Sequence, residues 1–197
     1  YQHCFVDSVQ PLVTALARHP IKRIIVVSST RVYGENQGQV VDDTTPPRPI
    51  DQQGQLLLEM EHAWQAAYPA QTVIVRPSGI YGTSIQRMLK LAQSTQDYPH
   101  IHWSNRIHID DLAAFLASLL HVEQCNASYI VTNNVPMPLH QTIQWFQRRL
   151  RLPELQLQSE LETGKKLYAT RMQGMGFTLK HPDCFADYLA MMEDHYA

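Results

Sequence analysis

The chain has 197 residues, of which 44% are apolar and 17% charged, and its formal net charge is -2 at pH 7. This composition fits a globular chain of about one domain and excludes a strongly basic protein, so we expect no nucleic-acid or membrane partner. No apolar run approaches the roughly 18 residues of a membrane-spanning helix. The three cysteines lack metal-ligand spacing, which is typical of reduced thiols in the cytoplasm.

Helical and strand patterns alternate over the first 82 residues. Apolar residues recur at helical spacing over residues 2–18, and the pair His19-Pro20 ends this predicted helix. The apolar, β-branched run at 24–29 predicts a strand that is buried on both faces. It is followed by a polar, Pro-rich loop at 35–49, a helix at 51–67, a second buried strand at 72–77 and a turn at 78–82.

The rest of the chain predicts mostly helices with isolated strands. We expect helices at 84–94, 110–121, 138–150, 166–175 and 182–194, with strands near 106–109, 128–132 and 155–158. Alternation of helices and strands predicts an α/β fold with a parallel sheet. The buried strands are too few for a complete doubly wound sheet, so we expect its C-terminal part and a small α+β C-terminal lobe.

Four segments with recognisable motifs occur in a fixed order. They are Ser28–Gly34 (SSTRVYG), the loop 44–49 leading to a helix with Glu59, Val75–Gly82 (VRPSGIYG) and Asn105–Ala113 (NRIHIDDLA). Together they resemble the NAD(P)-dependent epimerase/dehydratase family, the extended short-chain dehydrogenases/reductases, with its SSxxVYG, RPxxxYG and hxHVxDxA motifs. The resemblance implies a Rossmann-type doubly wound parallel sheet.

The resemblance also implies a division of the chain. Residues 1–132 would form a partial NAD(P)-binding domain, with small-lobe elements interleaved from about residue 83, and residues 133–197 a substrate-side lobe. Relatives begin with a strand, a GxxGxxG loop that holds the pyrophosphate and a helix, and the eight glycines here offer no such loop. We therefore expect the N-terminal half of the domain to be missing, so that NAD or NADP would bind to the full-length protein and poorly or not at all to this chain. Its uncovered sheet would favour self-association, for example as a homodimer.

Ser29 matches the hydroxyl that binds and polarises the substrate oxygen in relatives. A serine at a strand end can donate a hydrogen bond to a developing oxyanion. Alternatively, Ser28 and Ser29 only satisfy backbone groups at the turn. The resemblance implies cofactor contacts from Ser28 and from the turn after the second strand, where glycine allows a close approach or a positive φ. That turn comprises Pro77, Ser78, Gly79 and Ile80.

The family's catalytic Tyr-x-x-x-Lys pair is replaced in this chain. Aligning Glu59 with the acidic residue that follows the pair places Asp51 at the tyrosine position and Gln55 at the lysine position. Asp51 is then a candidate base, although its place at a helix start also fits an N-cap. Gln55 can hydrogen-bond a ribose, but it cannot lower the pKa of a neighbouring group as a lysine does.

The resemblance places four further residues near the substrate, namely Tyr33, Tyr81, Arg106 and His108. An alternating strand would put Arg106 and His108 on one face. From the residues alone, a hydrogen-bonded structural histidine is the favoured interpretation of His108. His100 and His102 lie nearby in the sequence, but no cysteine or paired carboxylate has ligand spacing, so we expect no metal site.

Two hypotheses about function follow. The first is an epimerase/dehydratase-like enzyme that acts on a small molecule, a nucleotide sugar or a related alcohol or carbonyl compound. Ser29 would orient the substrate, and Asp51 or an unassigned group would replace the tyrosine. The second is a catalytically silent NAD(P)-binding sensor or scaffold that kept the fold and lost the proton relay. The replaced pair favours the second hypothesis, whereas the retained Ser29 and the 77–82 segment favour a site still shaped for a ligand.

Overall fold

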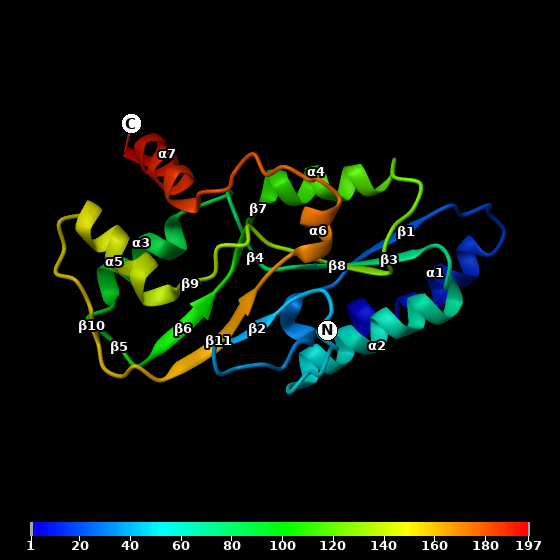
Figure 1. Cartoon of the computed structure of the whole chain (residues 1–197), viewed down its shortest axis with the longest axis horizontal. Coiled ribbons are helices and arrows are strands. Elements are labelled where there is room, and N and C mark those ends of the chain that lie inside the picture. The colour runs from blue at the N-terminus through cyan, green and yellow to red at the C-terminus, as the bar shows by residue number, and fades with distance from the viewer. Residues whose placement is uncertain (1, 197) are drawn as a thin grey trace.

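The computed structural model describes residues 2–196, and a parallel three-stranded sheet forms the right-hand part of the view in Figure 1. The strand order is β1-β3-β8, with bounds β1 (Ile24–Val27), β3 (Thr72–Pro77) and β8 (Ser128–Val131). Every residue of β3 is buried, because this strand has a neighbour on each edge and helices pack on both faces of the sheet. The two apolar runs that predicted buried strands therefore form adjacent parallel strands, with Val26 paired to Ile74.

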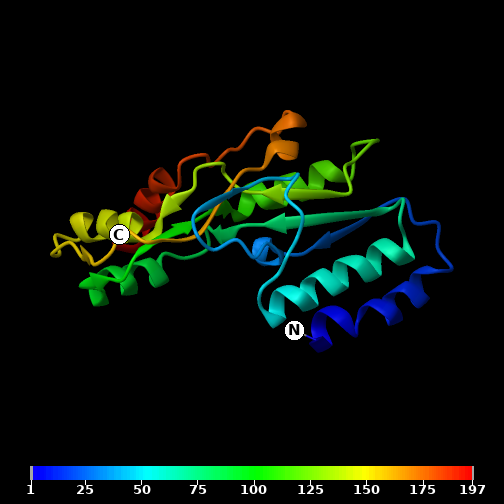
Figure 2. The same ribbon diagram turned by 60° about the horizontal axis from the view of Figure 1, so that its bottom comes forward.

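Helices cover both faces of this sheet (Figure 2). The helices α1 (Val9–Leu16) and α2 (Gln52–Ala67) lie on one side, and α4 (Ile109–Leu119) lies on the other. Leu57 and Trp64 of α2 and Phe115 of α4 enter the core that surrounds the sheet. The fold is thus the predicted Rossmann-type α/β arrangement, in which amphipathic helices bury their apolar faces on a parallel sheet.

A second sheet joins the small lobe to the rest of the molecule. Its order is β2-β11-β6-β9, and β11 runs parallel to both of its neighbours. The strands are β2 (Gln39–Val41), β11 (Glu162–Leu167), β6 (Ile101–Ser104) and β9 (Met137–Pro138). Gly164 in β11 has a φ of +71°, and a Cβ there would lie 2.5 Å from the carbonyl oxygen of Trp103, so the strand requires glycine at this point.

Helices and short strand pairs complete the small lobe. The helices are α3 (Gln86–Ser94), α5 (Leu139–Arg149) and α7 (Cys184–Tyr196), and the pairs are β4 (Gly79–Tyr81) with β7 (Arg106–His108) and β5 (Asp97–Tyr98) with β10 (Gln156–Leu157). Their side chains form a second core that includes Ile85, Leu89, Phe146 and Tyr188. The chain thus has one core around each part of the molecule.

The predicted helix at 166–175 is wrong over its first residues. The structure continues β11 to Leu167, and the short helix α6 (Thr170–Gly174) begins only after it. The stretch ETGKKL is polar, and its extended state depends on pairing with β2 and β6, which are distant in sequence. The strand β6 also depends on partners that are distant in sequence, and it was not predicted. The strand β2 lies inside the segment that was predicted to be a loop.

The predicted helix at 2–18 is divided in the structure. A π-helical turn, η1 (Gln2–Val6), comes first, and α1 begins at Val9. Pro11 explains the break, because its ring would clash with the carbonyl of Asp7 in a continuous helix and it has no N–H to donate. Proline is tolerated only in the first turn, which is where α1 places it.

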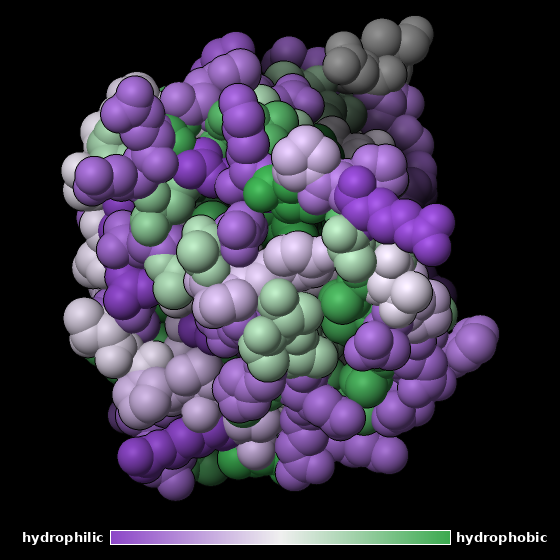
Figure 3. Space-filling model, turned by 90° about the vertical axis from the view of Figure 1, so that its right-hand side faces the viewer, coloured by the Kyte–Doolittle hydropathy of each residue, from purple (hydrophilic) through white to green (hydrophobic). Residues whose placement is uncertain are grey.

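The edge of β1 that faces away from β3 has no neighbouring strand among the described residues. Val27 at the end of this strand is 44% exposed. On the side of the molecule seen in Figure 3, polar residues surround separate apolar spots. Self-association through the open edge stays a prediction, as does the division at residue 132, since the second sheet pairs strands from both predicted parts. None of the helices between residues 2 and 196 is both long and apolar enough to span a membrane.

Candidate active site

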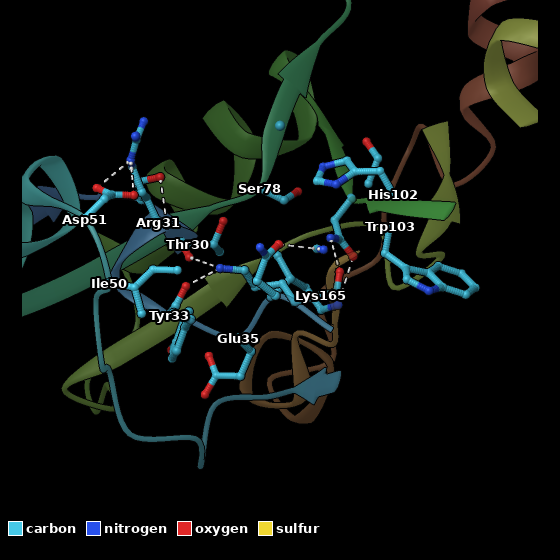
Figure 4. Close-up of a pocket in the computed structure, with 18 residues that line it drawn as sticks. Thr30, Arg31, Tyr33, Glu35, Ile50, Asp51, Ser78, His102, Trp103 and Lys165 are labelled. Atoms are coloured by element: carbon cyan, nitrogen blue, oxygen red, sulfur yellow. Dashed lines mark hydrogen bonds and ion pairs between the residues drawn. The ribbon is translucent and has the colours of Figure 1, made fainter. Parts of the chain in front are cut away.

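A cavity of about 610 Å³ lies where the carboxyl ends of β1 and β3 face the second sheet (Figure 4). Open α/β sheets bind their ligands at this end of the strands. The strand ends and their turns contribute Ser29, Thr30, Ser78 and Gly79, and the second sheet contributes His102, Trp103 and Lys165. The cavity is therefore built by both parts of the molecule.

Ser29 begins the 3-10 turn η2 (Thr30–Val32) directly after β1. Its Oγ accepts a hydrogen bond of 3.1 Å from the backbone N–H of Arg31. The hydroxyl hydrogen has no acceptor among the described residues, so it can donate to a ligand in the cavity that Ser29 lines. Both interpretations of this serine therefore fit, because it satisfies the turn and also faces the cavity.

Two buried hydroxyls beside Ser29 have no partner. The Oγ atoms of Ser28 and Ser78 form no hydrogen bond within the described part of the chain, although both residues are buried. A buried polar atom without a partner costs roughly 1–3 kcal/mol. Ser78 directly follows β3 and lines the cavity, so its hydroxyl fits a ligand that brings hydrogen-bonding groups to the strand end. Ser28, which follows β1, lies outside the residues that line the cavity.

The turn after β3 runs close to the second sheet. A Cβ at Gly79 would lie 2.9 Å from the carbonyl oxygen of Asn105, so glycine permits this close approach. Pro77 is buried, and its carbonyl accepts a hydrogen bond of 3.3 Å from Oγ1 of Thr30. Ile80 is exposed and borders a second cavity of about 250 Å³. Of these predicted cofactor contacts, only Ser78 and Gly79 line the main cavity.

Asp51 lines the cavity, but its carboxylate is held at the start of α2. Its Oδ1 accepts a hydrogen bond of 2.8 Å from the backbone N–H of Gly54, and both oxygens lie 3.0 Å from Nε of Arg31. These bonds, from Gly54 first and then from Arg31, hold the pKa of Asp51 below its ordinary value. Asp51 is thus an N-cap and a weakened base. Gln55 is exposed and lies outside the residues that line the cavity.

Lys165 extends from β11 into the cavity and was not singled out from the sequence (Figure 4). Its Nζ donates to the carbonyl oxygen of Thr30 at 3.4 Å and also to that of Tyr33. Burial lowers the pKa of this amine, while the carboxylates of Glu35 and Asp51 act in the opposite direction. No motif marks Lys165, because only the pairing of β11 brings it to the turn after Ser29.

Tyr33 is buried, and its hydroxyl is committed to the interior. It accepts a hydrogen bond of 2.8 Å from Nη1 of Arg76. The same guanidinium donates to both oxygens of Glu61, at 3.0 and 2.6 Å. We call these three residues the arginine network. Tyr33 therefore offers the cavity its backbone carbonyl, whereas its phenol is part of this network.

The other predicted substrate contacts lie toward the small lobe. The Tyr81 hydroxyl is 2.6 Å from Asp187, and burial raises the pKa of Tyr81. Arg106 is buried, and it donates to Tyr188 and Thr142, each at 3.1 Å. His108 is buried and accepts from the backbone N–H of Asp110 at 3.2 Å. The structure does not bring these residues into the cavity of Ser29, although Tyr81 and Arg106 border the second cavity.

One group in the described chain has metal-like spacing. Ligand atoms of His108, His181 and Asp187 all lie within 4.8 Å of one another. The two imidazoles, however, are stacked at 3.7 Å with planes only 14° apart, so their in-plane lone pairs run parallel and do not converge. His181 Nδ1 is also 2.7 Å from Asp187. This arrangement is a hydrogen-bonded cluster and provides no argument for a metal.

The motifs, the fold and the cavity agree with the comparisons to known proteins. Residues 2–129 match the model of the NAD dependent epimerase/dehydratase family. The chain belongs to this family. It is 31% identical over 187 residues to Protein YeeZ of Escherichia coli K12, covering 91% of this chain and 66% of that protein. The chain thus spans slightly less than two thirds of that curated relative.

Solved structures of epimerase/dehydratases have the same fold. One, provisionally named an NAD-dependent epimerase/dehydratase, from Methylobacillus flagellatus, superposes with a TM-score of 0.87 at 35% identity, covering 100% of this chain and 73% of that chain. MoeE5 in complex with UDP-glucose and NAD gives a TM-score of 0.74 at 17% identity, with 100% and 73% covered. The second likeness concerns the fold alone.

The helix that carries the catalytic pair in epimerase/dehydratases can now be compared with α2. Its buried acidic residue is Glu61, whereas Glu59 is exposed. In relatives the lysine lies four residues before the acidic residue. If Glu61 is taken as this acidic residue, the lysine position falls on Leu57, a core residue. If Glu59 is taken instead, it falls on Gln55. In either alignment the lysine position of α2 carries no charge, and the cationic side chains that line the cavity are those of Arg31 and Lys165.

Proposed function

We propose that this family member is an NAD(P)-dependent enzyme that oxidises or reduces an alcohol or carbonyl group of a nucleotide sugar or a related compound. The observation that supports this most is the cavity at the carboxyl ends of β1 and β3, where Ser29 has a free donor hydrogen. The complex of MoeE5 with UDP-glucose and NAD supports the chemical class of ligand. The choice between NAD and NADP stays open in this proposal.

The chain's own groups fit the nicotinamide end of such a cofactor. The unpartnered hydroxyl of Ser78, which lines the cavity, would hydrogen-bond its polar groups, and Gly79 would leave room for its ring. When bound, the nicotinamide accepts or gives a hydride. Ser29 would donate a hydrogen bond to the substrate oxygen and stabilise the negative charge that develops there.

Binding and chemistry are tested separately on the natural gene product that contains this sequence. Calorimetric titration with NAD and NADP measures binding, and a panel of UDP- and dTDP-sugars is then followed by absorbance at 340 nm and by NMR of the sugar. We expect one cofactor to bind and at least one sugar to be converted. Ser29→Ala should retain cofactor binding and lose about 10²-fold in kcat, since one oxyanion donor is removed.

The outcomes separate the two hypotheses about function. If neither NAD nor NADP binds, the proposal is overturned. Binding of a nicotinamide nucleotide without conversion of any sugar in the panel favours the silent sensor or scaffold instead. A variant at an exposed position of α2, Glu59→Gln, serves as the control, because this side chain lies outside the cavity.

Location and assembly belong to the same proposal. Cys4, Cys125 and Cys184 are free in the structure, which supports a reducing compartment such as the cytoplasm. The open edge of β1 supports self-association, which sedimentation velocity would measure.

A further inference from the structure

The charged groups around the cavity differ in what they already bind. Arg31 and Asp51 bind each other, with Nε 3.0 Å from both carboxylate oxygens, so their charges are mutually compensated. Glu35 and Lys165 also line the cavity, and no ion pair joins them among the described residues. Lys165 is thus the cavity's cation without a carboxylate partner.

Side-chain amides fix the backbone on both sides of Lys165. Asn105 donates from Nδ2 to the carbonyl of Lys165 and accepts from the N–H of Leu167, both at 2.8 Å. Asn36 accepts from the N–H of Gly164, also at 2.8 Å. The lysine is therefore presented by a strand held by two neighbouring strands and two asparagines. A group on such a rigid element is suited to precise chemistry.

The Lys165 ammonium has one donor left for a ligand. A protonated lysine has three N–H groups, and two of them point to the carbonyls of Thr30 and Tyr33. Both carbonyls belong to the turn that Ser29 caps. The third N–H has no partner within residues 2–196, so the Ser29 hydroxyl and this N–H are both free in one cavity.

We propose that Lys165 is the proton-transferring residue of this site and acts in place of the family's tyrosine. The inference rests on the function proposed above. In oxidation, the O–H bond of the substrate alcohol breaks and its proton passes to the neutral amine of Lys165. The C–H hydride leaves with its electron pair to an oxidised nicotinamide nucleotide, and the C=O bond forms. In reduction, the hydride passes from the reduced nicotinamide nucleotide to the carbonyl carbon, and the protonated amine gives its proton to the carbonyl oxygen.

The electrostatic surroundings agree with this role. Burial, acting first, lowers the pKa of the Lys165 amine, and Arg31 acts in the same direction while Glu35 and Asp51 oppose it. His102 is the histidine that lines the same cavity, and burial lowers its pKa too. A proton carrier works best when its pKa lies close to the working pH, so a lowered lysine pKa favours transfer near neutrality.

The first test measures the amine directly and needs no substrate. The folded protein is acetylated by trace acetic anhydride over a range of pH, and mass spectrometry gives the pH midpoint of reactivity for each lysine. We expect the midpoint of Lys165 to lie below that of the exposed Lys90. A midpoint equal to or above that of Lys90 overturns the proposal.

The second test uses the sugar nucleotide converted by the wild-type protein. Lys165→Met should retain cofactor binding and lose about 10²-fold or more in kcat, which is the usual contribution of a general acid–base residue. Lys165→Arg keeps the charge but cannot release a proton, so it should be equally slow. Lys166→Met is the matched control, because Lys166 is the next residue of β11 and lies over the Trp103 ring.

The results distinguish this inference from the proposed function. A wild-type protein that binds no nicotinamide nucleotide overturns both. If the wild-type protein converts a sugar and Lys165→Arg is as fast as the wild type, the inference alone is overturned. A positive charge or a tether at this position would then be sufficient for catalysis. Lys165→Met also loses the hydrogen bonds to the carbonyls of Thr30 and Tyr33, so the comparison with Lys165→Arg, which keeps a cationic donor, separates a proton carrier from a tether.

Discussion

Two buried polar networks hold this molecule together, and they differ in how completely they exclude water. In the arginine network, the side chains of Arg76 and Glu61 are 8% and 1% exposed. In the small lobe, Asp187 accepts from Tyr81 and bonds His181, and the side chains of Asp187 and His181 are 17% and 28% exposed. The first network anchors α2 to β3, and the second anchors α7 to β4. Water competes with the hydrogen bonds of the second network only. Removing a charge should therefore lower the free energy of unfolding by different amounts in the two networks.

The largest loss is expected from Glu61→Gln, which leaves the buried Arg76 guanidinium without its counter-charge. Breaking a buried ion pair from one side costs about 3–5 kcal/mol, and urea denaturation measures the change in free energy of unfolding. Glu59→Gln on the exposed side of the same helix is the control and should change this free energy by less than about 0.5 kcal/mol. If Glu61→Gln and Glu59→Gln lowered the free energy of unfolding equally, burial of the Glu61 carboxylate would not be the cause of the loss.

A smaller loss is expected from Asp187→Asn in the small-lobe network. The substitution weakens two charge-assisted hydrogen bonds that water can partly replace, so we expect about 1.5–3 kcal/mol of destabilisation. The exposed Glu193→Gln on the same helix is the matched control. If Asp187→Asn cost more than Glu61→Gln under the same denaturant conditions, water exclusion would not be what separates the two networks.

The smallest loss is expected from Asp51→Ala, which removes the N-cap of α2 at an exposed position. Such substitutions typically cost about 1 kcal/mol. The pKa of Asp51 is lowered in the folded protein, so its contribution is present above the unfolded pKa of about 3.9 and is lost as pH falls through the folded pKa. The stability difference from wild type should therefore shrink between pH 5 and pH 2, as urea titrations would show. A difference independent of pH would exclude the carboxylate as the cap.

The sequence was most informative where burial leaves a local pattern. Both runs, 24–27 and 72–77, were confirmed as strands, and they are neighbours in the sheet. The prediction of burial on both faces holds for β3, whereas in β1 only Val26 is buried and Val27 is exposed, because β1 lies at the edge of the sheet. The cap at Asp51 could also be read locally, since it depends on Gly54, three residues away. In contrast, β11 is polar and exists through its partners, so no window of the sequence could reveal it.

The same reason explains which parts of the site could be predicted. Ser29 was found because the strand end that carries it has a motif, and Ser78 because it follows Arg76-Pro77. Lys165 lies more than a hundred residues from Ser29 along the chain and reaches it only through the second sheet. Glu61 was missed in favour of Glu59 because both fit a helix, and only the position of Arg76 shows which of them is buried.

Gly164 has a consequence for how this site can vary among relatives. Its left-handed backbone next to the Trp103 carbonyl excludes other residues, and it immediately precedes Lys165. A substitution at Gly164 would redirect β11 and remove the lysine from the turn after Ser29 even with Lys165 unchanged. We therefore expect the two positions to covary across species, with lysine retained only in those homologues that keep the glycine before it.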